Sequence, residues 1–241
     1  MQTMYAMVRE VVSRYGQTSV CAHQFFISWH AVATLAYGGF SRTLLAVKRG
    51  LKDAIPGLIP ENSGSRWPKT TLGCLREGVA LSKKQVQLLR RICLKQTEEL
   101  NGIAEPDRTM DIKELHLVSF HCRTLERRLI SQGIGLAGKQ SQDDRPPSGH
   151  VEEVAETMAQ FGEEQHAKYY PELAPKGRTI DSYYRAPHIE TTIVYDLLPS
   201  APLIDRVDDF KRAVDGELPQ CYAWFEPTSW HMTVRALMSA G

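Results

Sequence analysis

Two short patterns in the sequence each place a basic side chain two residues before a threonine. One pattern holds Lys69 and Thr71, and the other holds His231 and Thr233. Both lie in stretches that we predict to be strands, and side chains two apart on a strand project from the same face. The second pattern is of special interest because an imidazole can accept or release a proton near neutral pH. Each pattern therefore presents one basic group and one hydroxyl on a single face.

These side chains also have ordinary structural interpretations. A histidine beside a tryptophan on an apolar strand, as His231 is beside Trp230, is often a hydrogen-bonded core residue. Lys69 is most simply a solvated charge at the edge of a sheet. Trp67, Trp224 and Trp230 could stack on bases, but core packing is the simpler interpretation. His30 is interpreted as structural, because Val32 stands where a threonine would complete the pattern.

The elements around the two patterns form two similar units, each with a strand, an amphipathic helix, a turn-rich loop and a second strand. The first unit comprises a strand over residues 25–37, a helix capped by Ser41 and ending near Ile55, and a strand over residues 67–75. The second unit comprises a strand over residues 191–198, a helix stripe over residues 203–214, and extended stretches over residues 222–225 and 230–237. Two β-α-β units predict an α+β fold.

The units are separated by further elements and by a change in composition. Ser82 and Gln85 form a capping box for a helix that runs to about Leu100, and Met110–Phe120 predicts another strand. From 137 to 187 the chain is rich in Gln, Asp, Pro, Gly and Lys, with one short helical stretch near 151–161. The low apolar density predicts that much of this segment could be removed without unfolding the rest.

We therefore divide the chain into three parts. These are a lobe over residues 1–136, an insertion or linker over residues 137–187, and a lobe over residues 188–241. The basic run of Arg123, Arg127 and Arg128, expected on a short helix, is interpreted as a solvated face. His116 and His121 are too loosely spaced to predict a metal site.

Composition and charge restrict the class of protein, its partners and its cellular compartment. The 241 residues are 42% hydrophobic and 24% charged, with a net charge of +1, so no overall field favours a nucleic acid or a membrane surface. The five cysteines are widely spaced and form no C-x-x-C pair, which favours reduced thiols in an intracellular compartment, cytoplasmic or organellar. No window approaches about 18 consecutive apolar residues. The first 16 residues have some character of an organellar targeting segment.

The stretch from Trp224 to Val234, which contains Pro227 followed by the histidine and threonine of the second pattern, resembles the first catalytic motif of the two-histidine (2H) phosphoesterases. This superfamily includes RNA ligases and cyclic nucleotide phosphodiesterases. The stretch Pro68-Lys69-Thr70-Thr71-Leu72 is similar to the second motif, with lysine in place of histidine. The strand over residues 111–119 resembles the one that follows that motif. The two halves occur in permuted order.

This resemblance implies two β-α-β lobes that form facing antiparallel sheets with helices outside. It also implies catalytic roles for His231 and Thr233 and phosphate binding by Lys69 and Thr71. The substrate would be an RNA end, a 2′,3′-cyclic phosphate or a cyclic nucleotide, and the acid/base chemistry would need no metal or other cofactor. Lysine, with a reference pKa near 10.4, indicates binding more than turnover.

Two alternatives to an active enzyme follow from the missing histidine. One is a degenerate family member that binds RNA or a protein without catalysis. The other is a structural subunit of a larger assembly, with residues 137–187 supplying contacts to a protein partner. A second histidine lying across from His231 would favour the enzyme.

Overall fold

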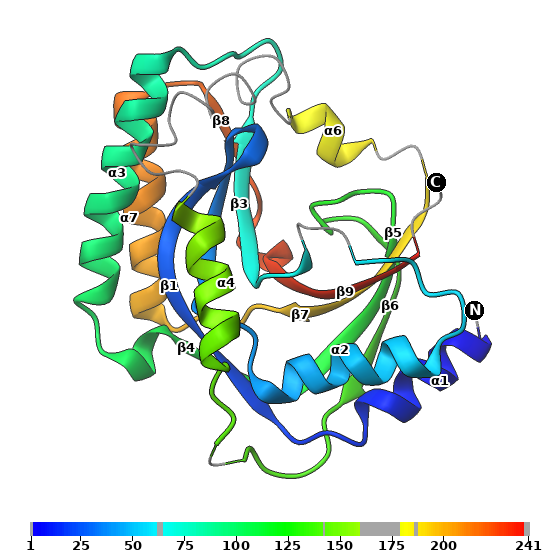
Figure 1. The fold of residues 1–241 in the computed structure, drawn as a ribbon. Helices are drawn as coiled ribbons and strands as arrows, with labels where there is room; N and C mark the ends of the chain where they lie inside the picture. Colours follow the sequence, from blue (N-terminus) through cyan, green and yellow to red (C-terminus); the bar gives the residue numbers. More distant parts are fainter. Residues whose placement is uncertain (1, 62–64, 142, 160–178, 186–187, 239–241) are drawn as a thin grey trace.

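The structure is a computed structural model and describes residues 2–61, 65–141, 143–159, 179–185 and 188–238 (Figure 1). Its strands are β1 (Thr18–Ser28), β2 (Val32–Tyr37), β3 (Lys69–Leu75), β4 (Thr109–Ile112), β5 (Glu114–Phe120), β6 (Arg128–Gly135), β7 (Glu190–Asp196), β8 (Tyr222–Trp224) and β9 (His231–Met238). Its α-helices are α1 (Gln2–Val12), α2 (Arg42–Ala54), α3 (Lys83–Asn101), α4 (Ser148–Ala159), α6 (Ile180–Tyr184) and α7 (Ala201–Glu217). The predicted α+β class is confirmed.

The strands form one curled sheet in which neighbouring strands are antiparallel. Their order is β4-β1-β2-β3-β9-β7-β5-β6, and the short β8 pairs with the end of β3. Figure 1 shows β1 to β3 on one side of the curl and β5, β6, β7 and β9 on the other. The two predicted lobes are therefore joined within a single sheet, through the pairing of β3 with β9.

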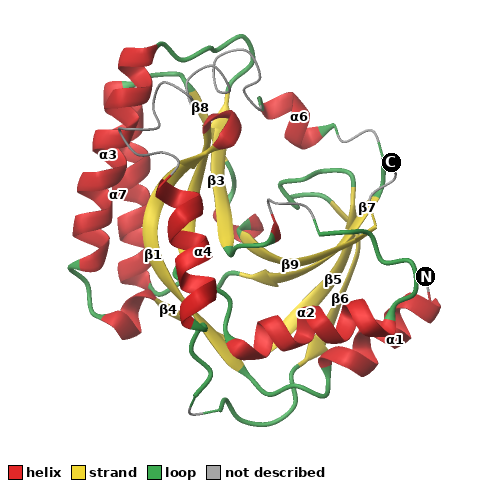
Figure 2. Cartoon of the chain, in the orientation of Figure 1, coloured by secondary structure: helices red, strands yellow, loops and turns green. Residues whose placement is uncertain are grey.

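Helices cover the outside of the curl, as expected (Figure 2). α3 packs against β1 and against α7, and Phe25 of β1 stacks on Phe210 of α7 with 4.4 Å between ring centroids. α1 and α2 lie together over another part of the sheet. No described helix is both long enough and apolar enough to cross a membrane.

The helix caps predicted from the sequence are present. The Ser41 side chain accepts a hydrogen bond from the Leu44 N–H at the start of α2. At the start of α3, Ser82 and Gln85 make both hydrogen bonds of a capping box. Such caps satisfy backbone groups that the first turn of a helix leaves without partners, so these two helix starts follow from local sequence.

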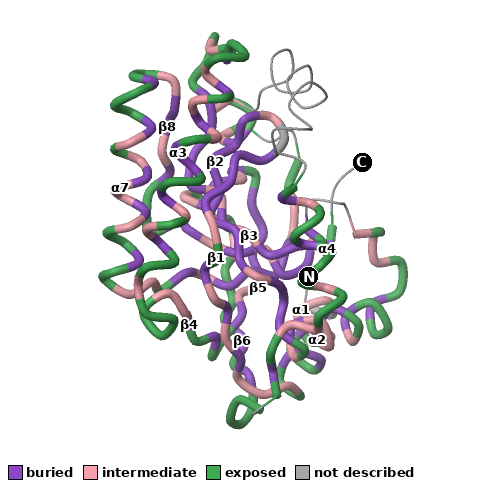
Figure 3. The backbone as a smooth tube through the Cα atoms, turned by 60° about the vertical axis from the view of Figure 1, so that its left-hand side comes forward, coloured by how far each residue is buried: buried purple, intermediate pink, exposed green. Residues whose placement is uncertain are grey.

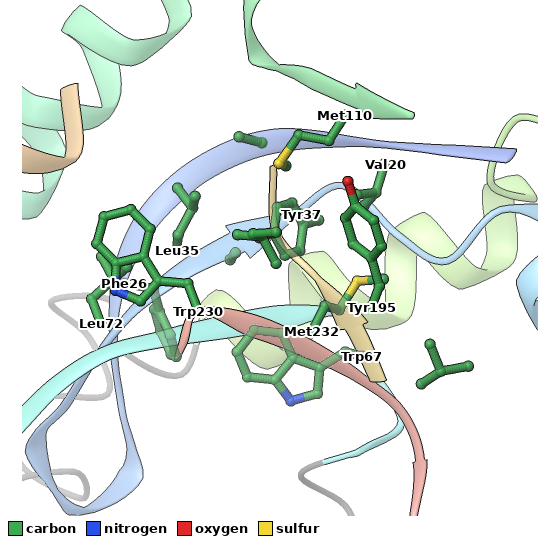
Figure 4. Packing of buried hydrophobic residues seen from close by; sticks show 14 of the residues in the cluster. Val20, Phe26, Leu35, Tyr37, Trp67, Leu72, Met110, Tyr195, Trp230 and Met232 are labelled. Carbon is green, nitrogen blue, oxygen red and sulfur yellow. The ribbon is translucent and has the colours of Figure 1, made fainter. Parts of the chain in front are cut away.

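Buried residues lie mainly on the strands, and the long helices alternate between buried and exposed residues (Figure 3). Figure 4 shows part of this core, including Tyr37 of β2, Met232 of β9, Trp230 directly before β9 and Trp67 before β3. Met232 is fully buried, and Trp230 is almost so. This packing fixes the helix-facing side of β9, where Lys211 of α7 lies over the Trp230 ring, and leaves the alternate residues of β9 on the opposite face.

Several sequence predictions need correction. Residues 25–37 are two strands, because the chain reverses at Trp29–Ala31, and His30 and Ala31 there have positive φ angles of 67° and 59°. Met110–Phe120 is also two strands, since β4 pairs with β1 while β5 pairs with β6 and β7. α1 and β6 were not predicted.

The segment from 137 to 187 is better anchored than its composition suggested. The Asp144 carboxylate accepts a hydrogen bond from the Thr43 N–H at 2.8 Å and so helps to cap α2. Val154 and Met158 of α4 are buried in the main core, and Tyr183 of α6 is buried in a smaller cluster. The described parts of this segment therefore contribute to packing, so its removal should lower the stability of the rest of the fold. Residues 160–178 lie outside the described part.

Candidate functional site

The two sequence patterns lie side by side on neighbouring strands. β3 and β9 are antiparallel and are paired at Thr70 and Met232, whose side chains are both fully buried. The residues on either side of this pair point to the opposite face. By the same register, Thr71 lies beside His231 and Lys69 lies beside Thr233. The four side chains thus form two rows that run across the strands, Thr71 with His231 and Lys69 with Thr233. Each row has one basic group and one hydroxyl.

All four of these side chains line one cavity of about 1120 Å³. Residues from β1, β2, β5, β7, α4 and α6 also line it, together with the segments that precede β3 and follow β5. The structure therefore brings together Lys69, Thr71, His231 and Thr233, the full set of site residues predicted from the sequence. Within the described residues, no three His, Cys, Asp or Glu side chains form a cluster suited to a metal ion.

A buried hydrogen-bond chain fixes the junction between the two strands. The Thr70 hydroxyl donates to the backbone carbonyl of His231 at 3.1 Å, and it lies 2.7 Å from the Tyr37 hydroxyl. Since the Thr70 proton is used toward His231, the Tyr37 hydroxyl is the donor to Thr70. Burial raises the pKa of Tyr37 far above its usual value, so the phenol stays protonated. The backbone of His231 is therefore held in a defined position.

The imidazole of His231 is oriented by its own loop. Its Nδ1 lies 2.9 Å from the carbonyl oxygen of Ser229, and because a carbonyl can only accept, Nδ1 carries the proton and Nε2 has the free lone pair. Burial lowers the pKa of His231 below 6.5; the Ser229 carbonyl and Asp196 oppose this change, and Arg128 adds to it. At neutral pH the side chain is thus an uncharged base.

A charge cluster lies next to His231 on the neighbouring strand. Asp196 is the cross-strand partner of His231, and it receives two hydrogen bonds from the Arg128 guanidinium, at 2.7 and 2.6 Å. His116 lies 3.2 Å from the same carboxylate and 3.0 Å from Glu114. Because Arg128 lies on β6 and is ion-paired, the prediction that it belongs to a solvated helical face is wrong.

Lys69 is not simply a solvated edge charge. It is partly buried, and its Nζ lies 4.0 Å from the centroid of the Trp67 ring, which is a favourable cation–π distance. Trp67 also packs edge-on against Phe26, with 5.7 Å between centroids, and both rings line the cavity. An aromatic wall therefore adjoins the ammonium group.

The other two tryptophans considered for base stacking have structural roles. Trp230 is buried, and its Nε1 donates to the Phe225 carbonyl at 3.3 Å. The Nε1 of Trp224 donates to the Asp215 carboxylate at 2.9 Å. Only Trp67 of the three lines the cavity.

The structure adds cavity residues that sequence reasoning did not assign to the site. They include His30, His150 and the ion pair between Arg123 and Glu190, whose nitrogen and oxygen are 2.6 Å apart. The sequence feature that could have pointed to His30 as a cavity residue is the repetition of Ser-Trp-His at residues 28–30 and 229–231. His30 lies at the tip of the β1–β2 hairpin, beyond the pairing of Ala33 with Gly73, so it is displaced along the sheet from Thr71 and His231.

Comparison with family models, curated proteins and solved structures found no match to this chain. Its function therefore has to be argued from the chemistry and geometry of the cavity.

Proposed function

We propose that the cavity binds a phosphodiester of an RNA end, a 2′,3′-cyclic phosphate or a cyclic nucleotide, and that His231 catalyses its hydrolysis by general-base chemistry. The proposal is carried by one observation. Two adjacent antiparallel strands present four side chains to one cavity, and the register at Thr70 and Met232 places Thr71 beside His231 and Lys69 beside Thr233. This arrangement resembles the paired motifs of the 2H phosphoesterases, except for lysine in place of one histidine.

The proposed reaction assigns a role to each side chain. With a 2′,3′-cyclic phosphate, the Nε2 of His231 accepts a proton from a water molecule whose oxygen attacks phosphorus. One bond between phosphorus and a ribose oxygen breaks, and that oxygen takes a proton from solvent. The Lys69 ammonium offsets negative charge on the phosphate oxygens, to which the hydroxyls of Thr71 and Thr233 donate. His231 then releases its proton to solvent.

Replacement of a proton-transfer histidine by lysine predicts slow turnover. Losing one of two such groups costs on the order of 10²–10⁴-fold in rate. The test measures hydrolysis of a 2′,3′-cyclic nucleotide by the wild type and by Lys69→His and His231→Ala, with binding followed by calorimetry. We expect Lys69→His to raise the rate and His231→Ala to abolish it. His121→Ala is the matched control, because His121 is exposed and does not line the cavity.

Wild-type turnover that survives His231→Ala would rule out the role of His231.

A second candidate function is binding without catalysis. The placement of the Lys69 ammonium over Trp67 favours it, because this ammonium is a strong partner for anions and a poor base. This second function would be supported if the wild type and Lys69→His both bind the cyclic nucleotide in a salt-sensitive way and neither hydrolyses it.

A further inference from the structure

A carboxylate lies directly beside His231 on the neighbouring strand. Asp196 of β7 is the register partner of His231 on β9. The Leu197 N–H donates to the Trp230 carbonyl at 2.9 Å, which identifies Asp196 and His231 as a non-hydrogen-bonded pair. In such a pair the Cα atoms are about 4.5 Å apart, and the two side chains lie close together on one face of the sheet. The Asp196 carboxylate is therefore a near neighbour of the His231 ring.

The Asp196 carboxylate is held in place from its far side. Arg128 reaches it from β6, across β5, and donates one hydrogen bond to each carboxylate oxygen, at 2.7 and 2.6 Å. The Nδ1 of His116 on β5 lies 3.2 Å from the Oδ2 of Asp196. With both of its oxygens occupied in this way, the carboxylate has a fixed orientation, and its charge stays beside β9.

The cluster around Asp196 continues across the sheet. The Oε1 of Glu114 lies 3.0 Å from the Nε2 of His116. A Cβ atom added to Gly133 of β6 would collide with the same Glu114 oxygen, so the absence of a side chain at this position makes room for the carboxylate. His116 therefore lies between two carboxylates, and the charged groups form one connected row over β7, β5 and β6 that ends beside His231.

The charges next to His231 are distributed unequally between its two neighbouring strands. On the β3 side its neighbour in register is the uncharged Thr71, and Lys69 lies one row further along. On the β7 side its neighbour is the negative Asp196, with the positive Arg128 behind it. A carboxylate close to an imidazole favours the protonated ring, whereas the more distant guanidinium disfavours it. Asp196 is thus placed to support a positive charge on His231.

We propose that Asp196, held by Arg128, is a positioning residue that stabilises the imidazolium formed when the Nε2 of His231 accepts a proton from the attacking water. This inference rests on the proposed function. The Nδ1 proton stays on the Ser229 carbonyl throughout, and no proton passes to Asp196, so the carboxylate acts only through its charge.

The experiment follows His231 in two independent ways. NMR titration of the full chain, with the His231 signals assigned by their absence in His231→Gln, gives the midpoint of its protonation without a ligand. Hydrolysis of a 2′,3′-cyclic nucleotide from pH 4.5 to 8 gives kcat and KM. Asp196→Asn keeps the shape of the side chain and removes its charge.

In Asp196→Asn, the NMR midpoint of His231 should fall by about one pH unit, because the ring loses its negative neighbour. The kcat should fall about tenfold, and the acidic limb of its pH profile should move to lower pH with the midpoint. The KM should stay within about twofold of the wild-type value, because Asp196 does not line the cavity.

Arg128→Gln tests the sign of the effect and serves as the second variant if Asp196→Asn is unstable. It removes a positive charge, so the midpoint of His231 should rise. Since burial lowers the pKa of His231, a general loosening of the site would raise the midpoint in both variants, and opposite changes therefore identify a charge effect. Asp209→Asn is the matched control, because Asp209 is ion-paired on α7, is 25% exposed against 28% for Asp196, and does not line the cavity.

The outcomes separate this inference from the proposed function. If His231→Ala abolishes turnover while Asp196→Asn changes neither the midpoint nor kcat, the role of Asp196 is wrong and the proposed function stands. A higher midpoint in Asp196→Asn, or a loss of kcat with an unchanged midpoint, would also overturn the inference, because either result would indicate a structural effect. Absence of turnover by the wild type rejects the proposed hydrolysis and, with it, the role of Asp196, whatever the titration shows.

Discussion

His231 combines a partly buried ring, a defined tautomer and a cross-strand carboxylate. Its Nδ1 proton is committed to the Ser229 carbonyl, and burial keeps the ring neutral. A general base needs a free lone pair at neutral pH, and Nε2 supplies it. The sequence predicted that His231 would share a face with Thr233, but it could not predict the tautomer, because that depends on the 3-10 turn at Pro227–Ser229.

The lowered pKa of His231 predicts a pH dependence of stability. Below pH 6.5 the unfolded chain binds a proton at this position, while the native protein does not until its own lower pKa is reached. The unfolded state then binds more protons, so the free energy of unfolding falls as pH falls through this window. Urea denaturation of the wild type and of His231→Gln from pH 7.5 to 5 should show a shallower decline in the variant. A parallel decline in the two proteins would contradict the assignment.

At the scale of elements, local signals predicted helices better than strand ends. The caps at Ser41 and Ser82 and the apolar stripe of α3 were all predicted. The turn at Trp29–Ala31 was missed, because its positive φ angles fall on histidine and alanine instead of the glycine or asparagine that normally mark such a turn. The surrounding hairpin imposes this conformation, and a local reading of the sequence cannot detect it.

The close approach of β8 to β3 gives a test of the sheet. A Cβ atom added to Gly73 would lie 2.7 Å from both the Ala223 carbonyl oxygen and the Trp224 ring. We expect Gly73→Ala to lower the free energy of unfolding by about 1–3 kcal/mol through overpacking. Gly135→Ala in β6, where nothing lies within 4 Å of the added atom, is the control and should change stability by less than about 0.5 kcal/mol. Equal effects in chemical denaturation would disprove this packing.

α4 offers a second test at the same scale. Val154 is 1% exposed and packs in the main core, whereas Val151, one turn earlier, is 40% exposed. Val154→Ala should therefore lower the free energy of unfolding by about 1.5–3 kcal/mol, and Val151→Ala should have little effect. Similar melting temperatures for the two variants would show that α4 does not dock as described.

For the whole molecule, the cavity depends on pairings that no local pattern predicts. The sequence suggested two units with similar closing strands, yet only the sheet order shows that these strands are neighbours. Pairing between distant segments is specified by the complete core, including Tyr37, Thr70 and Met232. For this reason the four candidate residues could be named from the sequence, whereas their arrangement around one cavity, and the part of α4 in its wall, could not.

The net charge of +1 gives a prediction about association with a nucleotide. Long-range steering requires a strong overall field, so the association rate constant should change little with ionic strength. The affinity should still fall with salt, because Lys69 supplies a local charge, and this fall should appear in the dissociation rate. Stopped-flow binding at two salt concentrations, with Lys69→Gln as the variant, checks both parts. A steep salt dependence of association that survives in Lys69→Gln would contradict the prediction.

The place of β9 in the sheet also sets the order in which the chain can fold during synthesis. Of the described strands, β9 is translated last, yet it lies between β3 and β7. Until it leaves the ribosome, both of those strands have an edge with open hydrogen-bonding groups, the kind of edge that pairs with other chains. The nascent protein is thus most prone to aggregation in the interval before β9 becomes free to pair, which is the stage at which a chaperone would be needed.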